Sequence, residues 1–428
     1  MAETLRDRVN ERLKAFGRVA APRFVGGNTL ELLQGGDALF PRMCEAIAAA
    51  RHDVWLATYI FHDDPAAQRV AAALIEAAAR GVSVHVVVDG FGSIATLSQV
   101  RALFAGSAVK LDVFRPLHRW YSWLQPGQLR RLHQKLCVCD EAVAFVGGIN
   151  LIDDRHDMNH GWTEAPRLDF AVRLQGPLVA EVRDTARAMW VRAHLWQGWR
   201  DEVRELARSA QPVRGAIGLL RQMRVRGPGR SGAGAAEGPV RAAFLVRDNL
   251  RQRRIIERSY VEAIRSARER VDIAVPYFYP GHGFRTALRR AARRGVQVRL
   301  LLQGKIDYRI AALAARALYE EMRSTGIRIY EYTPAFLHAK VAVVDGDWAT
   351  VGSSNIDPLS LLLNLEANVV VRDAGFAAAL TERFDAAFAV STEVTGVQRG
   401  GLRGWLQRAL VAAAANLYIR IAGVTRRY

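Results

Sequence analysis

The sequence predicts an α/β protein of two tandem domains with the same architecture, related by a pseudo-two-fold axis and sharing one active site. Three observations support this: strands and helices alternate in both halves of the 428-residue chain, stretches of the two halves nearly repeat each other, and a Gly-rich segment separates them. Such alternation favours a mostly parallel sheet between helical layers. The length suits two or three domains, each with its own core.

In the first half, apolar periodicity predicts a helix at 41–53, a strand at 54–61, a helix at 66–81 and a strand at 82–90. Gly81 stands where a helix C-cap is expected, and the β-branched run after it suits a buried strand. These elements account for the alternation at the start of the chain.

The same order returns in the second half. A helix is expected at 254–270, a strand at 271–279, a helix at 284–295 and a strand at 296–304. The residues themselves align, since AARGVSVHVVVDG matches ARRGVQVRLLLQG and places Gly295 opposite Gly81. A duplicated unit therefore accounts for most of the chain.

The expected boundaries follow from composition. We expect an N-terminal domain over 24–210, a flexible Gly-rich linker over 224–240, a C-terminal domain over 241–395 and an amphipathic tail over 396–428. The apolar run of the tail is too short to cross a bilayer and suits a membrane interface, with a helix packed on the domain as the alternative.

The chain carries 60 Lys and Arg against 42 Asp and Glu, a net charge of +18. This surplus favours nucleic acid, an anionic membrane or a phosphorylated substrate without choosing among them. An aromatic and arginine-rich insert over 117–131 suits lipid headgroups or stacked bases. The N-terminus lacks the apolar core of a secretory signal, and three cysteines, Cys44, Cys137 and Cys139, indicate a reducing compartment. The latter two are expected to be buried small hydrophobes.

One stretch occurs twice. RLHQKLCVCD at 131–140 and FLHAKVAVVD at 336–345 share a His, a Lys two residues on and an Asp five beyond, and each Asp is followed after six residues by a small-residue turn, GGIN or GSSN. The candidate catalytic residues are His133, Lys135, Asp140, His338, Lys340 and Asp345.

Strand alternation places the His and Lys of each copy on one face. Two copies together then supply two imidazoles and two ammonium groups, a phosphate site built without a metal. One histidine can attack phosphorus while the other protonates the departing alkoxide, through a phosphohistidine. The second histidine then deprotonates the incoming hydroxyl, from water or from an alcohol. The expected phosphate contacts are Gly148, Asn150, Ser353, Ser354 and Asn355.

A nucleophilic imidazole needs a carboxylate on its other nitrogen, so each copy should offer one. The candidates are Asp169 in RLDFAVRL and Glu366 in NLEANVVV, which align with each other. Asp140 and Asp345 stand at strand ends and are interpreted as structural anchors rather than proton carriers. Other histidines, among them His62 and His156, receive no role.

These motifs resemble the paired H-x-K-x4-D motifs of the phospholipase D superfamily, and FLHAKVAVVDGDWATVGSSNIDPLSLLLNLEANVVV more narrowly resembles bacterial cardiolipin synthases of the B type. The resemblance implies tandem phospholipase D-like domains that transfer a phosphatidyl group between two phosphatidylglycerol molecules, giving cardiolipin and glycerol, with no metal or other cofactor. His133 is then the nucleophile and His338 the acid and base, with the reverse assignment open. The first turn departs by having Gly148 where the second has a serine.

The same resemblance implies a phospholipid as partner and peripheral attachment to the cytoplasmic side of the bacterial membrane through basic and amphipathic segments, without nucleic acid. Three alternatives remain: a phospholipase D-type hydrolase, a nuclease of the superfamily, and a non-enzymatic protein that binds membrane or nucleic acid. The aromatic insert, the apolar tail and the second motif region disfavour the nuclease. Intact histidines in both copies disfavour the non-enzyme.

Overall fold

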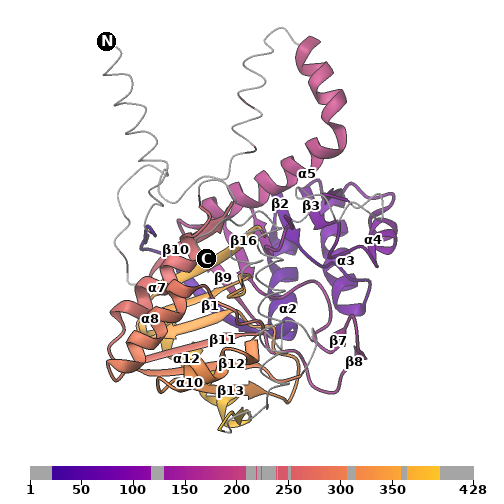
Figure 1. Cartoon of the computed structure of the whole chain (residues 1–428). Helices are drawn as coiled ribbons and strands as arrows, with labels where there is room; N and C mark the ends of the chain where they lie inside the picture. The colour runs from indigo at the N-terminus through magenta and orange to yellow at the C-terminus, as the bar shows by residue number, and fades with distance from the viewer. Residues whose placement is uncertain are drawn as a thin grey trace, which may run out of the picture.

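Two sheets stand side by side in the computed structural model, one from each half of the chain (Figure 1). The described residues are 22–116, 130–208, 240–248, 252–305, 315–357 and 364–395, with single positions 218, 223 and 238. The expected linker over 224–240 and the aromatic insert over 117–131 lie almost wholly outside these residues, and the tail over 396–428 lies wholly outside them.

The first half forms a seven-stranded sheet. In spatial order its strands are β1 (Thr29–Gln34), β9 (Phe170–Gln175), β6 (Val143–Gly147), β5 (Leu136–Cys139), β2 (Asp53–Thr58), β3 (Ser83–Asp89) and β4 (Lys110–Phe114). Its other elements are α2 (Gly35–Ala49), α3 (Pro65–Ala79), α4 (Leu97–Phe104), the long helix α5 (Val179–Arg208) and a hairpin of β7 (His156–Asp157) and β8 (Gly161–Trp162).

The second half forms an eight-stranded sheet in the same order. Its strands are β10 (Arg241–Arg247), β16 (Glu366–Arg372), β15 (Trp348–Gly352), β14 (Val341–Val344), β11 (Arg270–Val275), β12 (Gln297–Gln303), β13 (Arg328–Tyr332) and the added edge strand β17 (Thr392–Glu393). Its helices are α7 (Ile255–Ser266), α8 (His282–Arg293), α10 (Tyr319–Arg323) and α12 (Ala374–Ala389). The repeat expected from the sequence is therefore present as two tandem α/β units.

The expectation of mostly parallel sheets is wrong. Only β2, β3 and β4, and their counterparts β11, β12 and β13, run parallel. The other pairings are antiparallel, including both neighbours of each motif strand. A tight turn accounts for the antiparallel pairs β5–β6 and β14–β15, because short turns join antiparallel strands while parallel strands need a long crossover. The strands β9 and β16 run antiparallel to their neighbours after longer connections.

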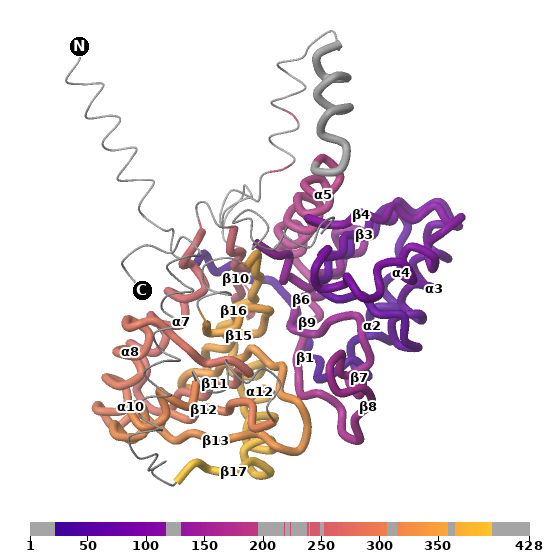
Figure 2. Tube along the Cα trace, turned by 45° about the vertical axis from the view of Figure 1, so that its right-hand side comes forward, coloured from indigo at the N-terminus to yellow at the C-terminus, as the bar shows by residue number. Residues whose placement is uncertain are grey.

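Helices cover the outer face of each sheet, α2 and α3 in the first half and α7 and α8 in the second (Figure 2). Gly81 and Gly295 follow the C-caps of α3 and α8 with the same positive φ of 91°, a conformation that glycine adopts without strain. Cys137 and Cys139 are buried in the apolar layer under α2, as expected of small hydrophobes.

A third apolar core lies between the two sheets and contains residues of both halves. Strands β6 and β9 contact β15 and β16 across it, α5 reaches β10, and α12 reaches β1. One helix of each half thus packs against a strand of the other half. No helix among the described residues is both long enough and apolar enough to cross a membrane.

Candidate active site

The two motifs meet where the halves exchange backbone hydrogen bonds. His133 N donates to Leu365 O at 3.0 Å, and His338 N donates to Leu168 O at 2.9 Å. Parallel bridges pair Leu132 with Leu365 and Leu168 with Leu337. Each motif histidine therefore lies beside the segment of the other half that leads into the strand carrying a candidate carboxylate.

This exchange determines the partner of each imidazole. His133 Nδ1 lies 3.0 Å from Glu366 Oε2, and His338 Nδ1 lies 2.6 Å from Asp169 Oδ2. Both carboxylates are buried, Glu366 at 0% and Asp169 at 1% exposure. The expected carboxylates thus hold the expected histidines, but each comes from the other copy rather than its own. A carboxylate on Nδ1 fixes the tautomer whose Nε2 carries the free lone pair.

Each motif lysine is hydrogen-bonded to the backbone carbonyl of the histidine of its own motif. Lys135 Nζ donates to His133 O at 2.7 Å, and Lys340 Nζ donates to His338 O. Burial lowers the pKa of Lys135 to about 8 and that of Lys340 to about 7, although the buried carboxylates Glu366 and Asp169 act to raise both values. The two ammonium groups are therefore held with little water around them, where an incoming phosphate is their best available partner.

Burial also shifts the pKa of the other buried groups. It lowers the pKa of His133, and lowers that of His338 well below the ordinary value with help from Lys340, Arg167, Lys135 and the other histidine. Burial raises the pKa of Asp169 to about 7. Burial therefore favours the neutral form of both imidazoles, which is the form that a nucleophile requires.

The small-residue turns hold the carboxylates rather than offering every donor to a ligand. Ser353 Oγ donates to Glu366 Oε2 at 2.5 Å and accepts from Ala367 N at 3.0 Å, while Ser353 N donates to Ala367 O at 2.9 Å. These bonds correct the expectation that Ser353 contacts phosphate, because its donors are used within the protein. We assign it to holding the partner of His133.

Gly148 occupies the corresponding place in the first half. A Cβ there would lie 2.4 Å from Asp169 Oδ1, so only glycine leaves room for this carboxylate. The amide of Gly148 donates to Phe170 O at 3.0 Å, which likewise removes it from the expected phosphate donors. The two halves therefore differ at two positions together: the second half has Ser353 beside Glu366, and the first half has Gly148 beside Asp169.

The remaining turn residues leave donors for a ligand. Asn150 Oδ1 accepts from Ile60 N at 3.2 Å, and Ser354 Oγ makes a long 3.3 Å bond to Asn355 O. Asn150 and Asn355 are buried at 4% and 7% exposure beside the motif strands. Their side-chain amides stay our candidates for phosphate contact.

Asp140 and Asp345 lie at the far ends of the motif strands from the histidines. Asp140 accepts backbone hydrogen bonds from Arg51, His52 and Asp53 at 2.6–2.8 Å, and Asp345 accepts from Arg268, Glu269 and Arg270 at 2.8–3.0 Å. Both have positive φ, at 53° and 51°, as tight hairpin turns require. These contacts agree with anchors of the sheet and place neither aspartate among the reacting groups.

Comparison with known proteins identifies the family. The model for "Cardiolipin synthase, PLD-like domain" matches residues 43–163 and 260–388, more than half of the chain. The chain belongs to this phospholipase D-like family. Cardiolipin synthase B of Salmonella typhi is 36% identical over 366 residues, covering 82% of this chain and 78% of the relative. Cardiolipin synthase B of Escherichia coli (strain K12) is 34% identical over 377 residues, covering 86% and 82%.

A solved structure shares the fold of this phospholipase D-like chain. Phosphatidylserine synthase from Haemophilus influenzae Rd KW20 superposes with a TM-score of 0.63 at 12% identity, covering 96% of this chain and 100% of that one. At this identity the likeness concerns the architecture alone. It extends over both halves, as expected of tandem phospholipase D-like domains.

Sequence reasoning missed three residues that shape the site of this phospholipase D-like protein. The Tyr59 ring lies 4.9 Å from that of His133 and 5.3 Å from Lys135 Nζ. Asp89 Oδ2 accepts from Leu132 N at 2.8 Å, and Gln303 Oε1 accepts from Leu337 N at 2.6 Å, so each fixes the residue before a motif histidine. All three lie at or just after the carboxyl end of a parallel strand, a placement typical of site residues in α/β proteins.

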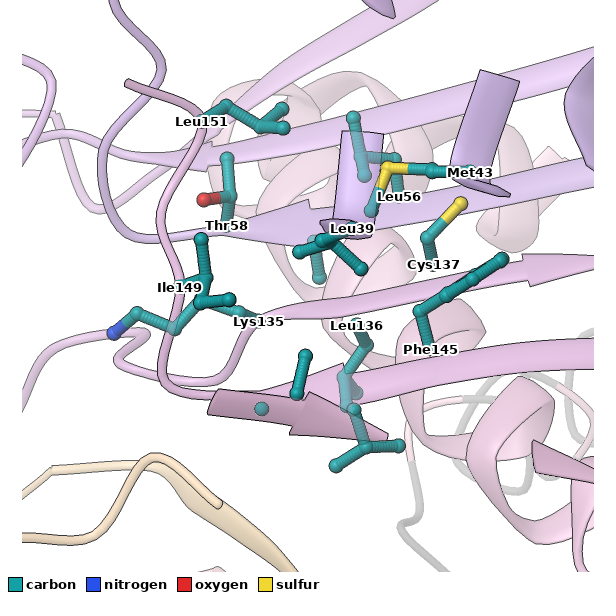
Figure 3. Close-up of a pocket in the computed structure, with 14 residues that line it drawn as sticks. Leu39, Met43, Leu56, Thr58, Lys135, Leu136, Cys137, Phe145, Ile149 and Leu151 are labelled. Atoms are coloured by element: carbon teal, nitrogen blue, oxygen red, sulfur yellow. The ribbon is translucent and has the colours of Figure 1, made fainter. Parts of the chain in front are cut away.

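A small apolar cavity lies next to Lys135 but is not the substrate site. Its volume is about 20 Å³, and its lining is mostly aliphatic and aromatic, between α2 and the sheet. Figure 3 shows Lys135 at its edge with the nitrogen directed away from the apolar side chains. Space of this size holds at most about one water molecule. The cavity is a packing feature behind the motif strand.

Proposed function

We propose that the protein is a cardiolipin synthase that transfers the phosphatidyl group of one phosphatidylglycerol to a second, releasing glycerol, through a phosphohistidine on His133. The observation that carries this is the crossed pair of buried His–carboxylate contacts over two buried lysines. One imidazole that attacks through Nε2 and a second that gives and takes a proton suit a double displacement at phosphorus. The named relatives supply the substrate class.

In the first step His133 Nε2 attacks phosphorus, so a P–N bond forms and the P–O bond to glycerol breaks. The leaving alkoxide takes a proton from His338, whose lowered pKa makes its imidazolium a strong acid. The lipid phosphate supplies the negative charge that allows His338 to carry this proton, because it offsets Lys340 and Lys135. Glycerol then leaves.

In the second step the hydroxyl of another phosphatidylglycerol gives its proton to His338 and attacks phosphorus. The P–N bond breaks, cardiolipin is released and His133 returns to its neutral form. Glu366 stabilises the charge on His133 while the phosphatidyl group is attached, since the carboxylate stays in contact with Nδ1. Water in place of the lipid hydroxyl would give phosphatidic acid instead.

We also propose that the protein works at the cytoplasmic surface of the bacterial membrane. The net charge of +18 favours anionic lipid. Two loops beside the site expose apolar side chains: Phe91 and Ile94 after β3, and Met158 and Trp162 on the β7–β8 hairpin, at 41–62% exposure. Ser93 Oγ of the first loop donates to Tyr59 O at 3.1 Å, which connects that loop to the wall of the site.

The test is mass spectrometry of the lipids formed when purified protein is incubated with phosphatidylglycerol vesicles. Cardiolipin formed by the unmutated protein, and absent with His133→Ala and with His338→Ala, is the expected result. Phosphatidic acid as the sole product would make the protein a hydrolase. If no lipid product forms, the transferase proposal is overturned and a nucleic-acid phosphodiester becomes the substrate to test.

A further inference from the structure

Three side chains without a role in the proposed reaction converge beside the site. They are His62, Asp64 and His156, and their donor atoms all lie within 4.8 Å of one another. Asp64 Oδ2 lies 3.4 Å from His62 Nδ1 and 3.7 Å from His156 Nδ1. The two imidazole rings are 4.5 Å apart between centroids at an angle of 84°. Two imidazoles thus face one carboxylate oxygen.

The backbone around this cluster is fixed by hydrogen bonds. His62 N donates to Leu151 O at 2.8 Å. Asp64 is the N-cap of α3, with Oδ1 accepting from Ala67 N at 3.0 Å, and its Oδ2 accepts from Asp153 N at 2.8 Å. Trp162 stacks on His156 with ring centroids 5.0 Å apart and an interplanar angle of 12°. The donors are therefore held in place before any ligand arrives.

The two imidazole nitrogens that face the carboxylate contact only acidic side chains, at 3.1–3.7 Å, and none of these contacts has the geometry of a good hydrogen bond. His62 Nδ1 and His156 Nδ1 are both buried, and Asp64 is only 6% exposed. Poorly aligned contacts leave buried nitrogens only partly satisfied, and a bound cation would accept the lone pairs of both. The arrangement is that of ligands gathered around a common centre.

We infer that His62, Asp64 and His156 bind a divalent transition metal ion of the zinc class. Two imidazoles and a carboxylate form a donor set that such ions prefer. Ligands at zinc bond lengths in tetrahedral geometry are separated by about 3.4 Å, close to the observed separations of Asp64 Oδ2 from the two imidazoles. Asp63 Oδ1, 3.1 Å from His62 Nδ1, or a water fills the fourth position.

The internal repeat shows that this cluster is separate from the duplicated chemistry. In the second half Tyr279 N donates to Ile356 O at 2.8 Å, the same backbone contact that His62 makes. The N-cap of α8 is Gly281, where α3 has Asp64. Equivalent backbone therefore carries ligand side chains in one half and none at these two positions in the other.

The ion has a structural role in this arrangement. It joins the segment after β2, which places Tyr59 against His133, to the segment after β6, which carries Asn150. Phosphoryl transfer itself takes place on the motif residues, and no step of it passes through this ion. Metal binding is measured without any lipid, so its outcome is independent of the proposed function.

The test uses the full-length protein, stripped with a chelator and titrated calorimetrically with Zn²⁺ alone. We expect one equivalent to bind. We expect His156→Ala and Asp64→Asn each to weaken Zn²⁺ binding by about 100-fold or more, which exceeds the loss usual for residues that only hydrogen-bond to a metal ligand. Asp64→Asn keeps an N-cap residue on α3, so folding is retained. The matched control is His160→Ala: His160 Nδ1 lies 2.8 Å from Asp157 and is not part of the cluster, so this variant is expected to bind Zn²⁺ normally.

Titration with Co²⁺ identifies the donors. Visible d–d bands without thiolate charge transfer are expected, and thiolate bands would assign the metal to the cysteines and overturn the inference. Equal Zn²⁺ affinity in the unmutated protein and in a folded Asp64→Asn variant would also overturn it. So would a loss of binding in His160→Ala equal to that in His156→Ala.

Discussion

His133 Nδ1 lies 3.0 Å from Glu366 Oε2, although the two residues belong to different copies of the repeated unit. The same crossing joins His338 to Asp169 at 2.6 Å. Neither half alone can complete a His–carboxylate pair. The duplicated chain therefore makes one site, in which each half positions the imidazole of the other.

The crossed pairs predict the effect of neutralising either carboxylate. Glu366→Gln and Asp169→Asn keep the volume of the side chain but remove the charge that stabilises the imidazolium, so we expect kcat to fall by about 100-fold or more with little change in KM. Steady-state kinetics on phosphatidylglycerol measure this. The control is Glu331→Gln, which changes a carboxylate paired with Arg316 away from the site. A rise in KM at constant kcat would instead indicate a role in lipid binding.

The matched differences at the turns predict unequal effects of two small substitutions. Ser353→Ala removes the 2.5 Å bond to Glu366, and we expect about a tenfold loss in kcat. Gly148→Ser places a Cβ 2.4 Å from Asp169 Oδ1, which displaces the partner of His338 and lowers kcat further. Ser324→Ala, which loses a 3.0 Å bond to the carbonyl of Glu321 at an exposed helix end, serves as control. Retained activity in Gly148→Ser would show that Asp169 tolerates displacement.

The sequence was sufficient for the duplication and for the residue types of the site, because the same residues recur at the same spacing in both copies. It was not sufficient for the partners. Alignment of Asp169 with Glu366 shows equivalent positions but not contacts, and the crossing arises only when the sheets pack. Asp89 and Gln303 do the same work with different side chains, so repetition alone could not single them out.

The prediction of mostly parallel strands was wrong for a related reason. Alternating helices and strands suggested crossovers throughout, whereas the motif strands are joined to their neighbours by tight turns at Asp140 and Asp345. The sequence also did not reveal the cluster of His62, Asp64 and His156. His62 and Asp64 are two residues apart, but His156 is more than 90 residues further along the chain, and the equivalents of the first two are Tyr279 and Gly281, so only the fold brings the three together.

Asp140 offers a prediction about stability. Burial acts to raise its pKa, but the amides of Arg51, Asp53 and His52 together lower it below its ordinary value. A carboxylate with a lowered folded pKa stabilises the fold at neutral pH, and this contribution is lost as pH falls through that pKa. We expect Asp140→Ala to reduce the free energy of unfolding by about 1–2 kcal/mol at pH 7 and by less in acid. Denaturant unfolding at both pH values measures this.

The control for that experiment is Asp347→Asn, whose side chain is 60% exposed in a loose ion pair with Arg372. Exposed pairs of this kind contribute little. A pH-independent effect of Asp140→Ala would mean that its charge does not matter. Activity per folded molecule is expected to be unchanged in both variants.

The exposed apolar residues beside the site predict how the protein meets lipid. Ile94→Glu and Met158→Glu place a charge where an apolar side chain is expected to enter the membrane surface, and we expect each to weaken binding to phosphatidylglycerol vesicles by about tenfold. Vesicle sedimentation measures this. Val390→Glu alters a residue of similar exposure outside these two loops and should bind normally. An equal loss in all three variants would indicate a general charge effect rather than contact by the loops.

The buried lysines predict the alkaline side of the pH profile. Burial lowers the pKa of Lys340 to about 7 and that of Lys135 to about 8, so both lose their positive charge as pH rises through this range in the free enzyme. Since kcat/KM reports the free enzyme, it should fall from about pH 7 upward. A bound lipid phosphate favours the charged lysines and raises their pKa, so kcat should fall only at higher pH. Profiles of both parameters at constant ionic strength, beside Lys305→Arg as an exposed-lysine control, would contradict this if the two alkaline limbs coincided.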